Sequence, residues 1–400
     1  MKRFLNIFRI KKGSDMIIHT IVILLALFGI VMAVSASMSD TEIHIKSLIF
    51  ESIKQLVFFL IGYMMMVFAS KLYDENLIKK IIMPVSIMMI FFLISTLFFP
   101  EVNGAKAWIR LKAGSVAFTL QPSEFAKVGM ILLVAYFLGD ISRNSRRTTW
   151  MMIEPIVFIL MAQVFVIIFL QKDFGSALVL MLIAFIVALI PSHPRLRRLQ
   201  YVAMVTVVFA VGMSIFLLSD FGMSTLEKIP FIQPYQLQRF HDYMNPFKSI
   251  LGSGYQLSGS LIAFSRGGWR GQGLGQSIQK YGYLPETRTD YILPLIAEEL
   301  GLIGVSILML IYAFLLYRLV YYALHVKSEK DKMILIGTTM YLFIHLALNV
   351  GGVSGSIPLT GVPLLLISAG GSSMMSILLA IGTAQAIISK YRLENKNAHR

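Results

Sequence analysis

The chain contains no cysteine and few charged residues, and each shortage excludes a class of protein. Its 400 residues include no thiol, so disulfide bonds and thiolate metal sites are excluded. Charged residues make up only 14% of the chain against 56% hydrophobic residues, which is too apolar for a soluble protein of this length. No internal repeat, low-complexity tract or linker divides the sequence. We therefore expect residues 1–400 to form a single membrane-embedded domain.

Long apolar runs are what the sequence has in abundance. Runs of about 18 residues predict membrane helices, because helices satisfy every backbone group within the lipid. The expected fold is thus an all-α, polytopic integral membrane protein with about ten transmembrane helices. The expected spans lie near Ile17–Val34, Ile53–Ala69, Ile81–Phe99, Phe125–Leu138, Ile153–Leu170, Ser176–Ile190, Val202–Leu218, Tyr291–Leu316, Met333–Val350 and Ser372–Ile388.

Lysine and arginine residues mark one side of the expected bundle. They gather after the second, fourth, sixth and eighth runs and at both ends of the chain. Because such residues are retained on the cytoplasmic side, we expect the N-terminal segment 1–15 and the tail 390–400 to be cytoplasmic. One large extracellular loop, residues 219–290, then joins the seventh and eighth helices. No small-residue cleavage site follows the first run, so we expect no cleaved leader.

The formal net charge of +15 favours an anionic partner. Because the basic residues are scattered among apolar runs, we expect anionic lipid or an anionic substrate, and no nucleic acid. Those in the outer loops would together suit a diphosphate, although any single one is equally explained as solvated surface charge. They are Lys106, Arg110, Lys112, Arg239, Lys248, Arg266, Arg270, Lys280 and Arg288.

Asp290 is the candidate for the chemical centre. It ends a glycine-rich, basic segment and stands directly before the eighth apolar run. A carboxylate at the mouth of a membrane helix is costly unless something uses it, although this aspartate could also serve only as a helix cap. Glu298 and Glu299 follow about two turns deeper and, as neighbours, point in different directions. At most one of them can face Asp290, and we expect the other to bond to a neighbouring helix.

The outer loop after the third run is a candidate binding segment. It begins with an Asn-Gly turn and places Trp108 between Lys106 and Arg110. Trp108 would lie at the membrane interface. An ordinary interfacial aromatic residue with flanking cations is the alternative.

The fourth run opens with Gln-Pro-Ser-Glu-Phe-Ala-Lys, which is typical of a helix start. We expect Ser123 to cap the helix, and Glu124 and Lys127 to share one face and pair. A lysine inside an apolar helix is expensive unless it is partnered, so the pair is either structural or has an electrostatic role near a substrate. Asp173, in a tight outer turn, is expected to cap the sixth helix.

Glycine and proline interrupt the apolar pattern in two places. The glycines between 267 and 275 would let the backbone approach a bulky substrate closely, and resemble a phosphate-binding loop only weakly. Residues 358–373 precede the last run and form either a simple loop or a helix break that lines a cavity. His345 and Asn349, one turn apart on the ninth run, are expected to form interhelical hydrogen bonds rather than bind a metal.

Six segments, in this order, resemble the SEDS family of FtsW, RodA and SpoVE proteins. The resemblance extends over nearly the whole chain, including the ten-helix layout and its large outer loop. The segments are NGAKAWI at 103–109, QPSEFAK at 121–127, QKDFGS at 171–176, GGWRGQGLGQSIQKYGYLPETRTDYI at 267–292, EELGLIG at 298–304 and PLTGVPLLLISAGGSS at 358–373.

The resemblance implies a peptidoglycan glycosyltransferase that polymerises lipid II on the outer face of the cell membrane, in cell division or cell-shape maintenance. It implies a class B penicillin-binding protein as transpeptidase partner, other divisome or elongasome membrane proteins, and a septal location if the chain is FtsW-like. The family's essential aspartate falls on Asp290, its loop tryptophan on Trp108, and its Glu/Lys pair on Glu124 and Lys127.

On this interpretation Asp290 is the catalytic base that deprotonates an attacking sugar hydroxyl. Cationic side chains would stabilise the departing lipid diphosphate, or a divalent ion such as magnesium or manganese held by Asp290 would do so; no other cofactor is expected. A lipid II flippase and a non-catalytic scaffold are the alternatives. The expected substrate-binding residues are Lys106, Trp108, Arg110, Glu124, Lys127, Arg239, Arg266, Lys280 and Ser368.

Overall fold

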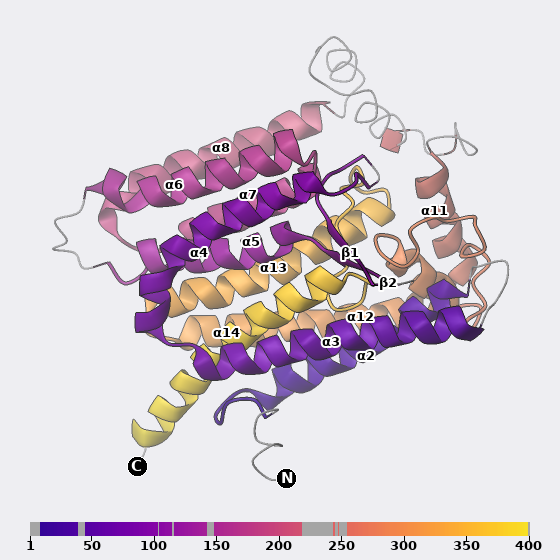
Figure 1. The fold of residues 1–400 in the computed structure, drawn as a ribbon, viewed down its shortest axis with the longest axis horizontal. Coiled ribbons are helices and arrows are strands. Elements are labelled where there is room, and N and C mark those ends of the chain that lie inside the picture. Colours follow the sequence, from indigo (N-terminus) through magenta and orange to yellow (C-terminus); the bar gives the residue numbers. More distant parts are fainter. Residues whose placement is uncertain are drawn as a thin grey trace.

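Among the residues that the computed structural model of this chain describes, ten long helices lie side by side (Figure 1). The structure describes residues 9–38, 45–102, 104–113, 116–141, 148–217, 243–244, 247 and 254–398. The long helices are α2 (Met16–Ser37), α3 (Ile45–Leu72), α4 (Glu75–Ser95), α5 (Pro122–Leu138), α6 (Thr149–Phe165), α7 (Phe174–Ala188), α8 (Arg197–Leu217), α12 (Ile292–His325), α13 (Glu329–Val353) and α14 (Gly371–Ala398). Shorter elements are η1 (Thr96–Phe98), β1 (Ile109–Ala113), β2 (Val116–Leu120), η2 (Val166–Leu170), η3 (Pro194–Leu196) and α11 (Tyr255–Gly267).

Each of the ten expected spans coincides with one of these long helices, so the predicted all-α, polytopic membrane fold is confirmed. Seven stretches in the described ranges are long and apolar enough to cross a bilayer by themselves, and α7 is a shorter apolar helix of 15 residues. At about 1.5 Å per residue α7 is roughly 22 Å long. It is therefore shorter than the hydrocarbon thickness, and an irregular segment at 171–173 precedes it.

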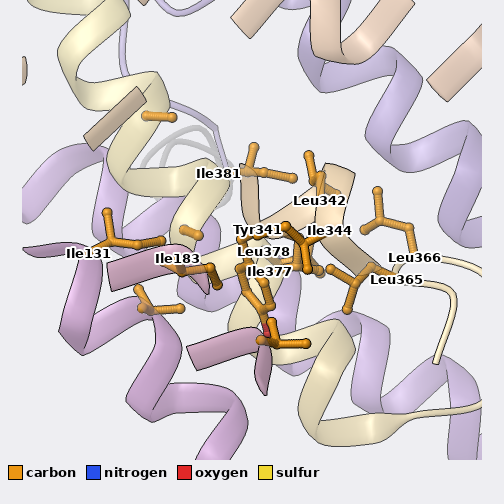
Figure 2. Close-up of a cluster of buried hydrophobic side chains, with 14 of the residues drawn as sticks. Ile131, Ile183, Tyr341, Leu342, Ile344, Leu365, Leu366, Ile377, Leu378 and Ile381 are labelled. Carbon is orange, nitrogen blue, oxygen red and sulfur yellow. The ribbon is translucent and has the colours of Figure 1, made fainter. Parts of the chain in front are cut away.

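The helix α14 lies at the centre of the bundle. In its most apolar stretch of 18 residues, 94% is buried, whereas only 22% is buried in the corresponding stretches of α4 and α12. Figure 2 shows the buried cluster in which side chains of α5, α7, α13 and α14 meet those of the loop before α14. Glycines allow the close approach of α3 and α14: a Cβ at Gly371 would lie 2.6 Å from the Phe58 ring, and one at Gly62 would lie 2.7 Å from Leu378.

One end of the bundle is held together by polar contacts of Asp15. Its carboxylate caps α2 by accepting from the amide of Ile17 (2.7 Å), and it also binds Arg318 and Tyr322 of α12. Its amide donates to Gln385 of α14 (2.8 Å). Burial raises the pKa of the Asp15 carboxyl, but hydrogen bonds from Tyr322 and Arg318 outweigh this, and the pKa lies below its ordinary value. The start of α2 is therefore fixed to α12 and α14.

The opposite end carries the irregular segments, including an antiparallel hairpin of β1 and β2 that sequence reasoning did not predict. Of the expected large outer loop, residues 219–290, the structure describes residues 243–244 and 247, the short helix α11 and the turns up to 290. The hydroxyl of Ser260 in α11 donates to the carbonyl of Val353 (2.5 Å), which ties the loop to the end of α13. Arg239 and Lys248 lie outside the described residues.

The helix α12 is broken within its first third. Gly301 has φ 67° and ψ −172°, a conformation outside the helical region. In an unbroken helix the amides of Leu302 and Ile303 would donate to the carbonyls of Glu298 and Glu299. The break separates both pairs, and four backbone groups inside the bundle need new partners.

The loop segment 268–273 supplies all four partners. The amides of Gln272 and Gly273 donate to the carbonyls of residues 298 and 299 at 2.9 and 3.0 Å. The carbonyls of Gly268 and Trp269 accept from the amides of residues 302 and 303 at 2.9 and 3.2 Å. The loop backbone is thus inserted between the two halves of the helix, and each separated group is paired again.

Glycines make this insertion possible. A Cβ at Gly301 would lie 2.5 Å from the carbonyl oxygen of Trp269, and one at Gly271 would lie 2.6 Å from the amide nitrogen of Gly301. A Cβ at Gly267 would lie 2.7 Å from the carbonyl carbon of Ala297. These three glycines therefore serve contact between the loop and α12. Gly267 and Gly271 belong to the segment 267–275, and the expected close approach of that segment to a substrate stays a prediction.

We expect Gly301→Ala to destabilise the protein by at least about 2 kcal/mol, because alanine is strained at φ 67° and its Cβ meets fixed backbone. Thermal unfolding in detergent measures the loss. Gly129→Ala in α5 is the matched control, because a Cβ there meets nothing within 4 Å. Equal melting temperatures for the two variants would contradict the packing explanation.

Candidate active site

Asp290 lies half-buried two residues before α12, at the end of the bundle that carries the irregular segments. Its backbone carbonyl accepts a hydrogen bond from Asn349 Nδ2 of α13 at 2.8 Å. Its carboxylate lies beside the exposed Gly361 in the loop 354–370, where a built Cβ would be 3.6 Å from Asp290 Oδ2. The carboxylate therefore borders an exposed part of that loop.

Ser368 fixes the backbone just before Asp290. Its hydroxyl donates to the carbonyl of Thr289 (2.7 Å) and accepts from the amide of Leu364 (2.9 Å). The next residue, Ala369, donates its amide to the carbonyl of Arg288 (2.8 Å). Ser368 is buried and both hydrogen-bonding functions of its hydroxyl are in use, so the structure gives it a positioning role. Its expected substrate contact stays a prediction.

Glu124 and Lys127 of α5 form the ion pair that their spacing predicts. Lys127 Nζ lies 2.7 Å from Glu124 Oε1 and 3.1 Å from His345 Nε2 on α13. Tyr341 donates to Glu124 Oε2 (2.6 Å) and contacts Ser376 Oγ of α14 (2.7 Å). At most 2% of either charged side chain is exposed. The pair thus joins α5, α13 and α14, and any effect on a substrate would act through its neighbours rather than by contact.

His345 links this ion pair to the loop beside Asp290. Its Nδ1 lies 3.0 Å from the carbonyl of Pro363. A carbonyl can only accept, so Nδ1 carries the hydrogen and Nε2 presents its lone pair to the ammonium of Lys127. The adjacent carbonyl of Val362 accepts from Asn349 (2.9 Å). One face of α13 therefore holds both Asp290 and residues 362–363.

The two glutamates of α12 are occupied in binding the outer loop. Glu299 pairs with Lys280 (3.2 Å) and accepts from Ser35 of α2 (2.7 Å), which confirms the expected bond to a neighbouring helix. Glu298 pairs with Arg266 (3.0 Å). Lys280 is buried, whereas the Arg266 side chain is 39% exposed. Both cations are paired with carboxylates, and these pairs weaken their attraction for a diphosphate.

The loop that carries Trp108 lies at the same end of the bundle as Asp290. Lys106 is exposed, and Trp108 and Arg110 are partly exposed, so all three can meet a ligand. The amide of Lys106 donates to the carbonyl of Gln171 (2.9 Å), whose side chain donates to the carbonyl of Leu93 (2.8 Å). The loop is thus attached to η2 and α4.

Asp173 caps α7 as predicted, through a hydrogen bond from the amide of Ser176 (3.0 Å). It also accepts from the side chain of Gln121 (2.9 Å), a contact that sequence reasoning missed. The prediction that Ser123 caps α5 is wrong. Pro122 occupies the first helical turn and Gln121 the cap position, since proline suits the first helical residue. Ser123 lies buried inside the helix instead.

Within the described ranges, no group of three or more His, Asp or Glu side chains is arranged to hold a metal ion. Magnesium is commonly bound by one or two carboxylates together with substrate phosphates. A divalent ion at Asp290 would therefore need oxygen ligands from the substrate itself, and it stays a prediction.

Comparison with known proteins identifies the family of this chain. Residues 15–393 match the FtsW, RodA and SpoVE family model, described as cell cycle protein. The chain belongs to this family. Stage V sporulation protein E of Bacillus subtilis (strain 168) is 35% identical to this family member over 282 residues, 70% of each chain. The probable peptidoglycan glycosyltransferase FtsW of Lactococcus lactis is 33% identical over 301 residues, 71% of this chain and 68% of the relative.

Solved structures agree on the fold of this FtsW/RodA/SpoVE protein. A chain from a study of structural coordination of polymerization and crosslinking by a peptidoglycan synthase complex superimposes with a TM-score of 0.70 at 24% identity, covering 94% of this chain and 98% of that one. The rod shape determining protein RodA of Thermus thermophilus gives 0.60 at 23% identity, covering 94% and 96%.

We expect Lys127→Met to destabilise the protein by about 3–5 kcal/mol, because it leaves the carboxylate of Glu124 buried without its cation. The double variant Glu124→Gln, Lys127→Met should recover most of this loss, since it leaves no uncompensated charge. Thermal unfolding of the three proteins in detergent measures both effects. A single variant that costs less than about 1 kcal/mol would mean that the pair behaves as an exposed one.

Proposed function

We propose that this chain is a peptidoglycan glycosyltransferase that polymerises lipid II on the outer face of the cell membrane, with Asp290 as its catalytic base. Membership of the FtsW, RodA and SpoVE family and the names of its relatives support the reaction. The observation that supports the residue is the placement of Asp290, held by α13 and by the loop 354–370.

In the proposed reaction, the 4-hydroxyl of one lipid-linked disaccharide attacks the anomeric carbon of another chain. A C–O bond forms, the bond to the lipid diphosphate breaks, and the hydroxyl proton passes to Asp290. General-base catalysis of this kind contributes roughly 10²–10⁴ in rate. Lys106 and Arg110, which are at least partly exposed at the same end, are suited to stabilise the leaving diphosphate.

A lipid II flippase is the main alternative function. Transporters keep their ionisable groups near the middle of the bilayer. Here Asp290 precedes the first residue of α12, and Lys127 lies in the second turn of α5. Both groups are therefore near one end of their helices, which favours surface chemistry over transport.

The proposed topology places both termini in the cytoplasm. Ser389 donates to the carbonyl of Lys12 (2.6 Å) and Arg392 to that of Ser14 (3.0 Å), so the start of α2 and the last part of α14 lie together. The basic segments after α3 and α7 lie at this end of the bundle, and Asp290 lies at the opposite end. A class B penicillin-binding protein is the proposed partner and, if the chain acts in division, the septum the proposed location.

Asp290→Asn should abolish polymerisation by purified protein supplied with labelled lipid II, assayed as product length on a gel with and without a co-expressed transpeptidase. The amide keeps the size of the side chain but cannot accept the proton. Asp74→Asn is the control: Asp74 caps α4 at the opposite end by accepting from the amide of Asn76, which an asparagine can also do.

Three outcomes separate the candidate functions. Full-length glycan from a folded Asp290→Asn protein would refute the role of this residue. An inactive wild-type protein that moves lipid II across vesicles would favour the flippase. If the protein is a scaffold, neither the wild type nor Asp290→Asn would make glycan, and the Asp290→Asn variant would still support growth.

A further inference from the structure

Asn349 is a buried asparagine near the outer end of α13, with 1% of its surface exposed. Its Nδ2 lies 2.8 Å from the carbonyl oxygen of Asp290 and 2.9 Å from that of Val362. Both partners can only accept hydrogen bonds, so the NH₂ side of the amide must face them. The chemistry of the two partners therefore fixes the orientation of this side chain.

The oxygen of the Asn349 amide is not used in the same way. Its Oδ1 is buried and has no hydrogen-bond partner among the residues that the structure describes. A buried acceptor without a partner costs stability. Packing alone therefore does not explain an asparagine here, and its polar benefit lies in the two bonds that it donates.

Those two bonds join the segment that carries Asp290 to the loop beside it. One partner, the Asp290 carbonyl, belongs to the peptide that leads into Tyr291, the cap residue of α12. The other, the Val362 carbonyl, directly follows Gly361, which lies against the Asp290 carboxylate. A single amide thus bridges the start of α12 and the loop that borders the carboxylate, in addition to the bonds that Ser368 and Ala369 make to the carbonyls of residues 289 and 288.

We infer that Asn349 is a positioning residue for Asp290. The bond at 2.8 Å fixes the peptide plane that follows Asp290, and with it the direction in which the carboxylate leaves the backbone. A catalytic base displaced by about 1 Å can lose roughly 10²-fold in rate. This inference rests on the proposed function, since it assigns Asn349 to the same reaction.

The test is Asn349→Leu, which is similar in size but donates no hydrogen bond. We expect kcat for lipid II polymerisation to fall at least about tenfold with KM within about threefold, because the substrate still binds while the base is misplaced. Asn349→Gln keeps a donor amide and should exceed the kcat of Asn349→Leu by about threefold or more. Thr339→Val is the control, since Thr339 is buried on the same helix and bonds only within it, to the carbonyl of Leu335.

The melting temperature in detergent separates positioning from stability. Asn349→Leu should melt within a few degrees of Thr339→Val and keep its low kcat well below that temperature. A kcat within about twofold of wild type overturns the inference, and so does a loss of kcat that follows the loss of folded protein. If Asn349→Leu does not fold, Asn349→Gln decides: a folded variant with kcat more than tenfold below wild type overturns the inference, and one within about threefold supports it. Failure of the wild type to polymerise lipid II would refute the proposed function instead.

Discussion

The structure depends on one constraint: backbone amides and carbonyls inside a membrane bundle must find partners within the protein. Where α12 breaks at Gly301, the backbone of 268–273 supplies them. Where the chain is irregular between α13 and α14, Asn349, His345 and Ser368 supply them. These two irregular segments are therefore fixed in place, and the candidate catalytic residue lies between them in the sequence.

Asp290 is placed by buried polar groups that do not themselves reach the surface. The ion pair of Glu124 and Lys127 contacts His345, and His345 and Asn349 together hold residues 362–363. Changes in the buried pair of α5 can thus reach the backbone of Asp290 through His345, residues 362–363 and Asn349. This arrangement reconciles the burial of the Glu/Lys pair with its expected importance for the reaction, because it can influence the reacting group without touching the substrate.

Much of the fold could be predicted because length and apolar composition specify a membrane helix regardless of its neighbours. The site was less predictable wherever a role depends on tertiary contact. The sequence indicates Arg266 and Lys280 as available cations, but their carboxylate partners lie 32 and 19 residues further along the chain. The predicted cap of α5 is wrong, although Pro122 at the first helical turn indicates Gln121 as the cap residue. The β1–β2 hairpin has strands of five residues each, too short to stand out within a loop.

The insertion of loop backbone into α12 also constrains how this protein can vary. The four bonds pair residues 268, 269, 272 and 273 with defined positions of the helix, so adding or deleting one residue between 269 and 272 would put the two accepting residues out of register with the two donating ones. The exposed side chains of Trp269 and Arg270 take no part in that register. Among relatives with the same helix break, the length of the segment 268–273 should thus be kept even where its exposed residues differ.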